Sequence, residues 1–350
     1  MCCRYLKYYI SKPKRYAMKK FLKILLVIAV LLTIAYFLGP KPDAPQLLAF
    51  NGRIADSLPV LEETITATEK AEKGIKPDNE ARIVWFDTAH KQKTSIAFLY
   101  LHGFSASQEE GDPVHRHVAQ QFNANLYLAR LAGHGVNLGD STMVALTADD
   151  LYNSAEKALA ITQKLGDTVV VMATSFGAAL ALRLASAHPE IKALVTYSPC
   201  VKIYDDNAEL VDNPWGMLLG RLITGSYYRK LQPQNPEHDK YWNMYYHMNG
   251  VLAIQNFLTH AMVPSTFNKV KCPVFMGYYY NNETEQDKVV SVPAMLQMFE
   301  QLGTPANNKQ KVAFPAAANH VLASPVLSHD VAHVEAETMA FLKKVVFARQ

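Results

Sequence analysis

A serine in the middle of the chain lies where a buried strand is expected to end and a helix to begin. The segment TVVVMATSFGAALAL (168–182) passes from β-branched residues to small, helix-forming residues, and Ser175 stands at the change. A serine hydroxyl is a weak nucleophile until a base activates it, and a sharp strand-to-helix turn exposes it for attack. Ala173 and Gly177 are small enough for the close passage of strand and helix that such a turn requires. Ser175 is therefore a candidate nucleophile, although a serine that only starts a helix also fits this pattern taken alone.

A glycine-containing loop after an earlier strand-like run is suited to binding a developing oxyanion. The run LYLHGFSAS (99–107) contains His102, Gly103 and Phe104 at its turn. Acyl transfer needs hydrogen-bond donors aimed at the oxygen of the tetrahedral intermediate, and backbone N–H groups supply them. From position alone we expect one donor at Phe104 and a second at Phe176, the residue after the nucleophile. The alternative is an ordinary glycine turn in which His102 is structural.

A histidine near the C-terminus is the candidate general base. His320 lies in AAANHVLASP (316–325), between the expected last strand and the last helix, where a loop can reach Ser175. The chain has 12 histidines, most of which must be structural, and position is what singles out His320. We expect His333 to lie on the last helix, and His134 to shape the site without transferring protons.

An aspartate after another strand-like run is the candidate acid. Asp287 follows YYYNNETEQ, and its carboxylate would fix the imidazole tautomer and stabilise the imidazolium. The two valines of DKVV (287–290) can seat this loop against the core. Glu283 and Glu285 are close rivals, and a solvated acidic loop without catalytic function is the alternative.

Together these motifs resemble the α/β-hydrolase superfamily, and most closely its monoacylglycerol lipase and bacterial carboxylesterase branch. The resemblance extends over residues 82–347, with nucleophile, acid and histidine in the superfamily's order. It implies that Ser175, Asp287 and His320 form a catalytic triad, and that neither a metal nor an organic cofactor takes part. Ala173 departs from the usual glycine, a change that related hydrolases tolerate. The motifs that carry the resemblance are HGF (102–104), RLAGHG (130–135), ATSFG (173–177), DKVV (287–290) and NHVL (319–322).

Strand-like and helix-like segments alternate from residue 82 onward. Helical spacing at 109–122 and 145–166 lies between apolar strand-like runs, and the pattern continues to a closing helix at 328–348. This alternation predicts an α/β fold with a mostly parallel, doubly wound sheet covered by helices on both faces. Ligands bind beyond the carboxyl ends of the strands in such sheets, and the candidate site residues all fall in loops at that end.

Residues 200–270 interrupt this alternation and are rich in aromatic and methionine side chains. Inserted between two strands, they are expected to form a helical lid over the strand ends. Aromatic rings and methionines make adaptable apolar walls, which suit an acyl or aromatic group. At least half of these side chains must serve only to hold the lid together.

The N-terminus carries a basic flank followed by an apolar run. Residues 24–38 contain no charged side chain, and the segment 21–39 is close to the roughly 20 residues that span a bilayer. We expect an uncleaved single-pass anchor, because bulky residues follow the run where a signal-peptidase site would lie; a cleaved signal peptide is the alternative. The basic flank predicts a cytoplasmic tail and an extracytoplasmic catalytic domain. If residues 1–17 are translated, Cys2 and Cys3 could be acylated beside the membrane, although inert thiols are the simpler expectation.

Composition is that of an ordinary globular protein and argues against several other classes. Of the 350 residues, 49% are hydrophobic and 19% are charged. The net charge of +4 is misleading, because the first 23 residues hold eight basic residues and no acid, and subtracting eight leaves about −4 for the rest. A mildly acidic domain lacks the basic surface that nucleic acid requires. Four cysteines are too few for a disulfide scaffold. Cys200 and Cys272 are expected at opposite ends of the sheet, too far apart for a disulfide bond. No Cys/His group has the spacing of metal ligands.

These patterns predict a membrane-anchored serine hydrolase that cleaves carboxylic esters, acylglycerols among them, through an acyl-enzyme. A proline-type aminopeptidase on the same fold is the alternative enzyme, and it would need acidic lid side chains to bind a free amine. Those available are Asp205, Asp206, Glu209, Glu237 and Asp239. A hydrolase fold that only binds or anchors is the alternative outside enzymes. The expected organisation is a cytoplasmic tail (1–20), a membrane segment (21–39), a stalk and helix (40–80), the first part of the core (81–199), the lid (200–270) and the second part of the core (271–350).

Overall fold

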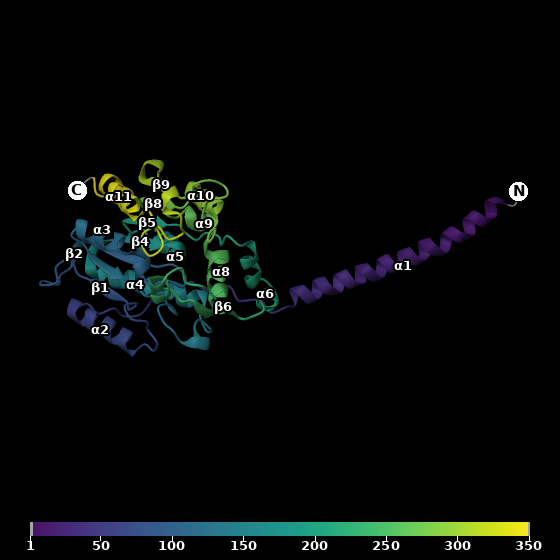
Figure 1. Cartoon of the computed structure of the whole chain (residues 1–350), viewed down its shortest axis with the longest axis horizontal. Coiled ribbons are helices and arrows are strands. Elements are labelled where there is room, and N and C mark those ends of the chain that lie inside the picture. The colour runs from purple at the N-terminus through teal and green to yellow at the C-terminus, as the bar shows by residue number, and fades with distance from the viewer. Residues whose placement is uncertain (1–2, 349–350) are drawn as a thin grey trace.

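A long helix projects from a rounded body in the computed structural model of this chain (Figure 1). The structure describes the backbone of residues 3–348 and the side chains of residues 16–348. The helix α1 (Cys3–Phe37) makes the projecting arm, and the residues that follow it make the body. Cys2 and the side chain of Cys3, which we considered as acylation sites, lie outside the described residues.

Within the described residues, a seven-stranded sheet forms the centre of the body. Its strands lie in the order β1-β3-β2-β4-β5-β8-β9, and neighbouring strands are parallel except for β1 and β3. The prediction of a mostly parallel α/β sheet is therefore confirmed. The strands are β1 (Arg82–Val84), β2 (Thr94–Leu101), β3 (Asn125–Leu128), β4 (Gly166–Thr174), β5 (Ala193–Tyr197), β8 (Val274–Tyr278) and β9 (Lys309–Ala313).

Helices cover both faces of this sheet, so the central strands are apolar on both sides. In β2, Leu99 belongs to the apolar cluster shared with α4 and α5, whereas its neighbour Phe98 belongs to the opposite cluster with α3 and α11. This alternation is the period of two expected of a strand with two buried faces. The covering helices are α4 (Ala148–Leu165), α5 (Ser175–Ala187) and α10 (Val292–Gln301) on one face, and α3 (Val114–Gln121) and α11 (Val331–Phe341) on the other.

The helix expected at 109–122 begins later than the sequence pattern indicated. Residues 108–111 form a 3₁₀ turn, and the α-helix starts only at Val114. Pro113 accounts for the difference, because proline disfavours the helical conformation of the residue before it, and Asp112 is extended with a ψ of 134°. The break places two acidic residues in a turn instead of on a helix surface.

Between β5 and β8 the chain leaves the sheet and builds the inserted segment 200–270. Its helices pack beside a short antiparallel pair of strands, β6 and β7. The segment is therefore not purely helical, which differs from the helical lid that we expected. The elements are a 3₁₀ segment (Asp206–Asp212), α6 (Gly216–Thr224), β6 (Tyr228–Lys230), α7 (Pro236–Tyr241), β7 (Tyr245–His247), α8 (Asn249–Ala261) and α9 (Pro264–Phe267).

Residues 43–50, in the expected stalk, are fastened to the body. The carboxylate of Asp149, at the start of α4, accepts hydrogen bonds of 2.7 and 3.2 Å from two backbone N–H groups of this segment. The side chain of Asn256 on α8 donates to the carbonyl oxygen of Asp43 (3.2 Å). Residues 38–42 therefore link the end of α1 to the hydrogen bond at Asp43.

The helix α2 (Leu58–Ala71) continues from this segment and lies against the body by one face. Leu61 and Ile65, four residues apart, are buried, and most of the other side chains of the helix are exposed. This spacing is that of an amphipathic helix on a protein surface.

Candidate active site

Ser175 stands at an abrupt reversal from strand to helix. β4 ends at Thr174, and α5 begins at Ser175 itself. The φ angle of Ser175 is +54°, a left-handed value that is uncommon in residues other than glycine and persists where the surrounding fold demands it. A Cβ on Gly177 would lie 2.2 Å from the carbonyl oxygen of Leu101, so no larger residue fits where the helix passes the neighbouring strand. Ala173 is completely buried at the end of the strand, which agrees with the tight turn expected from small residues.

Asp287 and His320 are joined by a short hydrogen bond. Nδ1 of His320 lies 2.6 Å from Oδ2 of Asp287, which is completely buried. Oδ1 of the aspartate accepts two further hydrogen bonds, from the backbone N–H groups of Val289 (2.8 Å) and Val290 (3.1 Å). The two valines of this motif therefore hold the carboxylate through their backbone, whereas only Val290 also packs in the core and Val289 is exposed.

The buried carboxylate also controls the charge of the histidine. Burial of the His320 ring disfavours its charged form, but the attraction and hydrogen bond of Asp287 outweigh this, so the pKa of His320 is raised above its ordinary value. When Nδ1–H donates to the aspartate, Nε2 is left as the acceptor that a general base needs. The pair can take a proton from a hydroxyl and stabilise the imidazolium that results.

One short segment after β5 connects the serine turn with the histidine loop. The hydroxyl of Ser198 donates to the carbonyl oxygen of His320 (2.8 Å), and the N–H of Cys200 donates to the carbonyl oxygen of Ser175 (3.0 Å). The Ser175 hydroxyl and Nε2 of His320 are not hydrogen-bonded to each other or to any other described group. In hydrolases without substrate this catalytic bond is often long, and it shortens when the substrate binds.

The loop after β2 places backbone donors beside Ser175. A Cβ on Gly103 would lie 2.9 Å from Cβ of Ser175, which shows how closely this loop passes the candidate nucleophile. The N–H groups of Phe104 and Phe176 donate to no described residue, so both are free to bind an oxyanion. These are the two donors expected from their positions in the sequence.

A buried carboxylate that the sequence did not reveal lies at the same loop. Glu110 is almost completely buried, and its Oε2 accepts a hydrogen bond from the N–H of Gly103. Burial raises the pKa of Glu110 to about 7, against the opposing effects of that hydrogen bond and of the nearby His320. In the sequence, Glu110 is one of two adjacent glutamates in a stretch expected to be helical, and no local signal points to a buried acid.

The residues considered as rivals for acid and base form no hydrogen bond with Asp287 or His320 among the described residues. His333 is on α11, where its ring is about half exposed and pairs with an aspartate at the start of that helix. His134 is buried, packs edge-on against Phe104, and has a pKa lowered to about 4 by burial, so it stays neutral. Glu283 and Glu285 form hydrogen bonds within their own exposed loop.

The inserted segment packs on both candidate oxyanion donors. Tyr246 meets Phe104 edge to face with 5.2 Å between ring centroids, and Phe257 meets Phe176 in the same way at 5.3 Å. The N–H of Asn243 also donates to the carbonyl oxygen of the residue after Phe104 (2.7 Å). Aromatic rings of the inserted segment thus pack on the side chains of both residues, and the candidate nucleophile itself is only 6% exposed.

Most of this chain matches a known enzyme family. Residues 92–322, well over half of the sequence, match the profile of the serine aminopeptidase family S33. The chain belongs to this family of α/β-hydrolases. The resemblance to α/β-hydrolases that the sequence motifs indicated is thereby confirmed. No curated protein sequence matches the chain.

Solved structures of lipolytic enzymes share the fold of this S33 hydrolase. One of the metagenome-derived lipolytic enzymes LipS and LipT has a TM-score of 0.60 at 20% identity, over 77% of this chain and 99% of its own. A soluble variant of monoglyceride lipase from Saccharomyces cerevisiae has a TM-score of 0.55 at 12% identity, over 77% and 91%. The monoacylglycerol lipase from Paleococcus ferrophilus has a TM-score of 0.54 at 15% identity, over 75% and 98%.

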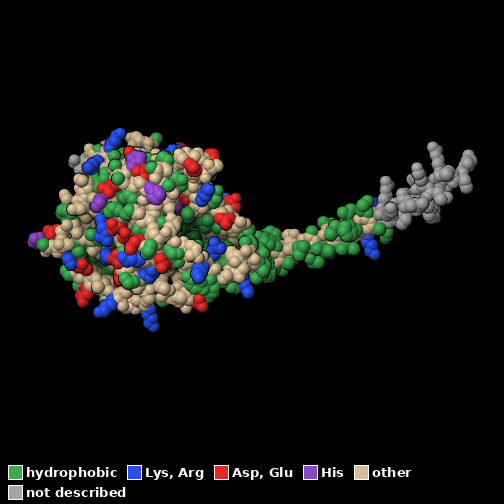
Figure 2. Space-filling view, in the orientation of Figure 1, with side chains coloured by type: hydrophobic (Ala, Val, Ile, Leu, Met, Phe, Trp, Pro, Cys, Tyr) green, Lys and Arg blue, Asp and Glu red, His purple; other side chains and the backbone are tan. Residues whose placement is uncertain are grey.

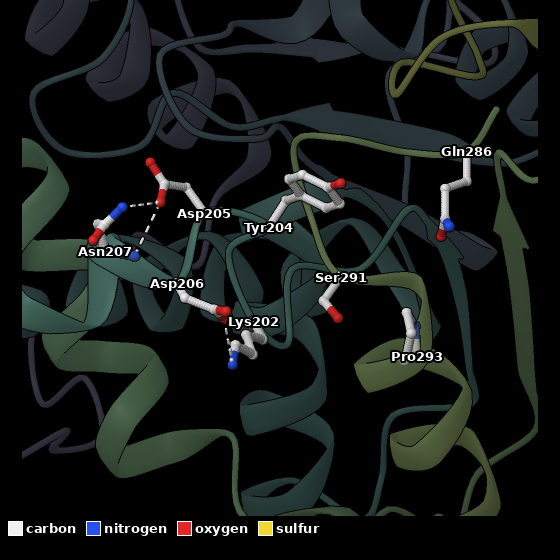
Figure 3. Close-up of a pocket in the computed structure, with 8 residues that line it drawn as sticks. All are labelled: Lys202, Tyr204, Asp205, Asp206, Asn207, Gln286, Ser291 and Pro293. Carbon is white, nitrogen blue, oxygen red and sulfur yellow. Dashed lines mark hydrogen bonds and ion pairs between the residues drawn. The ribbon is translucent and has the colours of Figure 1, made fainter. Parts of the chain in front are cut away.

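A polar hollow of this S33 hydrolase borders the loop that carries Asp287 (Figure 3). Residues 202–204 pair in antiparallel fashion with 289–291, and the hollow lies beside this pairing. In Figure 3, Lys202 points to Asp206, with which it forms an ion pair of 2.9 Å. The described lining includes none of the candidate triad residues, so the hollow is separate from the site. It consists of Lys202, Tyr204, Asp205, Asp206, Asn207, Gln286, Ser291 and Pro293.

Proposed function

We propose that this protein is a serine hydrolase that cleaves carboxylic esters, acylglycerols among them, with Ser175, His320 and Asp287 as its catalytic triad. The observation that carries the proposal is the left-handed Ser175 at the turn between β4 and α5, because such backbone strain is retained at functional sites. The hydrogen bond between Asp287 and His320 supports the same assignment. The lipolytic enzymes that share the fold support an ester as the substrate.

The proposed reaction has two halves that use the same groups. Oγ of Ser175 attacks the ester carbonyl while Nε2 of His320 takes its proton, and Asp287 stabilises the imidazolium. The N–H groups of Phe104 and Phe176 hold the negative oxygen of the tetrahedral intermediate. The imidazolium then protonates the leaving alcohol, which breaks the ester bond and leaves the acyl group on the serine. A water molecule, deprotonated by the same histidine, attacks the acyl-enzyme and releases the acid.

Hydrolysis of an amino-terminal peptide bond is the alternative, since the name of the family refers to aminopeptidases. Binding a free amine there would need acidic side chains of the inserted segment that are not already paired with a lysine or an arginine. Asp206 and Glu209 both pair with Lys202, at 2.9 and 3.0 Å, and Glu237 lies 3.7 Å from Lys240. Asp205 and Asp239 form no ion pair among the described residues, but three of the five acids already have a cation, so ester cleavage is the better supported activity.

An uncleaved membrane anchor is the second part of the proposal. The segment Tyr16–Phe37 of α1 is long and apolar enough to cross a bilayer, and it is not buried against the body. All eight basic residues of the N-terminus lie before the uncharged run 24–38, three of them at the start of this segment, so the positive-inside rule puts the tail in the cytoplasm and the body on the other side. Full-length protein that resists alkaline carbonate extraction would support the anchor, and a mature protein that begins after residue 39 would identify a cleaved signal peptide instead.

A fluorophosphonate probe tests the proposed nucleophile. It should label the wild-type protein but not the Ser175→Ala variant, whose fold is checked by its thermal unfolding. Esters of p-nitrophenol with graded acyl chains, compared with proline amides, then distinguish the two activities. Turnover of the amides alone would favour the aminopeptidase, whereas a folded protein that takes no label would favour a binding module without catalysis.

A further inference from the structure

The helix α6 of the inserted segment buries its glycines and exposes its large apolar side chains. Its buried residues are Gly216 and Gly220, and a Cβ on Gly216 would lie 2.1 Å from the carbonyl oxygen of Leu210, so the helix is pressed closely onto the body by its glycines. Its large apolar side chains face away from the body, which is the opposite of an ordinary surface helix. Four of them form the α6 apolar face: Leu218 (42% exposed), Leu219 (37%), Leu222 (70%) and Ile223 (64%).

This face lies beside the end of the proposed membrane helix. Trp215, directly before α6, donates from its indole Nε1 to the carbonyl oxygen of Ala35 (3.0 Å) and from its backbone N–H to that of Pro40 (2.9 Å). Gly39 lets the indole approach, because a Cβ there would lie 2.0 Å from Nε1. Figure 1 shows α6 next to the C-terminal end of α1, and in Figure 2 apolar side chains continue from the arm onto the adjoining end of the body.

The contact with Ala35 fixes the depth at which α6 would lie. Ala35 precedes the end of the apolar stretch at Phe37 by two residues, or about 3 Å along a helix. If α1 crosses a bilayer, Trp215 therefore lies at the boundary between acyl chains and headgroups, which is where tryptophan is enriched. Lys41 follows Pro40 directly in the sequence, and α6 carries Arg221, whose guanidinium lies 4.9 Å from the centroid of the Tyr227 ring; both cations suit a surface of lipid phosphates.

We propose that α6 lies in the surface of the bilayer that α1 crosses, with the α6 apolar face among the lipid chains. The inference rests on the proposed membrane anchor, and it adds a second membrane contact that orients the body. A bilayer fits the face better than a protein partner does, because the face is continuous with residues 24–37 of α1, which carry no charge and are exposed on all sides. The inserted segment that carries α6 also packs on Phe104 and Phe176, so the membrane contact and the wall of the candidate site belong to one structural unit.

Fluorescent labelling of the full chain in phosphatidylcholine vesicles tests the proposal. Single cysteines are introduced as Leu222→Cys on the α6 apolar face, Leu31→Cys within α1, and Val60→Cys on α2, in a background with Cys2, Cys3, Cys200 and Cys272 replaced by serine. Each is labelled with an environment-sensitive dye, and quenching by spin-labelled lipid is measured. Val60 is the matched control, since it is 49% exposed on a helix of the body far from α1.

The three positions separate this proposal from the proposed anchor. We expect the dyes at positions 31 and 222 to emit at shorter wavelength and to be quenched by spin-labelled lipid, and the dye at position 60 to show neither effect. Quenching at 31 combined with a water-like signal at 222 would overturn the contact of α6 while leaving the anchor standing. A water-like signal at position 31 would overturn the anchor and this inference together.

Discussion

Replacing Gly177 by alanine is the sharpest test of the turn at Ser175. The new Cβ would meet the carbonyl oxygens of Leu101 and His102 at 2.2 and 2.5 Å. Close contacts between carbon and oxygen are about 3.3 Å or longer, so helix and strand must separate by about 1 Å. Both oxygens belong to the backbone at the end of β2, and they cannot rotate away as a flexible side chain could.

Two free-energy effects of opposite sign decide the size of the loss. Forcing extra atoms into a packed interior costs about 1–3 kcal/mol, whereas alanine in a helix is favoured over glycine by at most about 1 kcal/mol. We expect a net destabilisation of about 1–2 kcal/mol, which lowers the Tm by roughly 2–8 °C. The same displacement moves the loop that carries Phe104, and a misplacement of about 1 Å can reduce turnover about 100-fold.

The assay compares purified full-length variants in detergent, by thermal unfolding and by hydrolysis of a p-nitrophenyl ester. Gly220→Ala is the matched control, because its Cβ would meet Cε of Met248 at 2.8 Å, a flexible side chain that can move aside, and Cγ1 of Val211 at an ordinary contact distance of 3.5 Å. The control should change neither Tm nor turnover by much. A Gly177→Ala protein with the Tm and activity of the wild type would show that strand and helix do not approach as closely as described.

Seven further substitutions, at five positions, test the neighbouring groups. His320→Ala should be inactive and His333→Ala nearly normal in ester hydrolysis, and the reverse result would reassign the base. Asp287→Asn should lower kcat about 10⁴-fold. Because Asp287 raises the pKa of His320, and the base must be neutral, loss of the carboxylate should also move the acid limb of kcat/KM to lower pH, and an unmoved limb would contradict this coupling. Ala173→Gly should keep its activity, whereas Ala173→Val should impair folding or activity because this position is completely buried; a fully active valine variant would argue against a tight turn. Glu110→Gln should retain the hydrogen bond from Gly103 and most of the activity, whereas Glu110→Ala should lose both stability and activity; equal behaviour in Tm and ester hydrolysis would mean that this bond does not matter.

The candidate triad could be predicted from the sequence because its members follow strand-like runs. In a parallel sheet all carboxyl ends lie at one edge, so residues far apart in the sequence are expected near each other once the strands are placed. This reasoning anticipated the hydrogen bond between Asp287 and His320, which are 33 positions apart. It also anticipated the close passage at Gly177, because small residues on both sides of a serine indicate a tight turn.

Other features depend on contacts that no local pattern encodes. Glu110 is buried because Pro113 delays the next helix and the preceding turn folds onto Gly103, so the environment of the acid is set by a tertiary contact. From composition, many apolar side chains of residues 200–270 were expected to hold the lid together. In α6, however, two glycines decide which face is buried, and the leucines are exposed. The bond between Trp215 and Ala35 joins residues 180 positions apart and has no counterpart in the sequence pattern.

The fastening of residues 43–50 to the body has a consequence for how an anchored enzyme would meet its substrate. The five residues 38–42 can extend at most about 18 Å, and the carbonyl of Pro40 among them is already bonded to the body. With the anchor intact, the body is therefore confined to a thin layer next to the bilayer. Encounters with membrane-resident esters then depend on their number per unit area of membrane, and diluting the suspension leaves that rate unchanged. A water-soluble ester would instead be hydrolysed in proportion to its bulk concentration, so the ratio of the two rates would change with dilution.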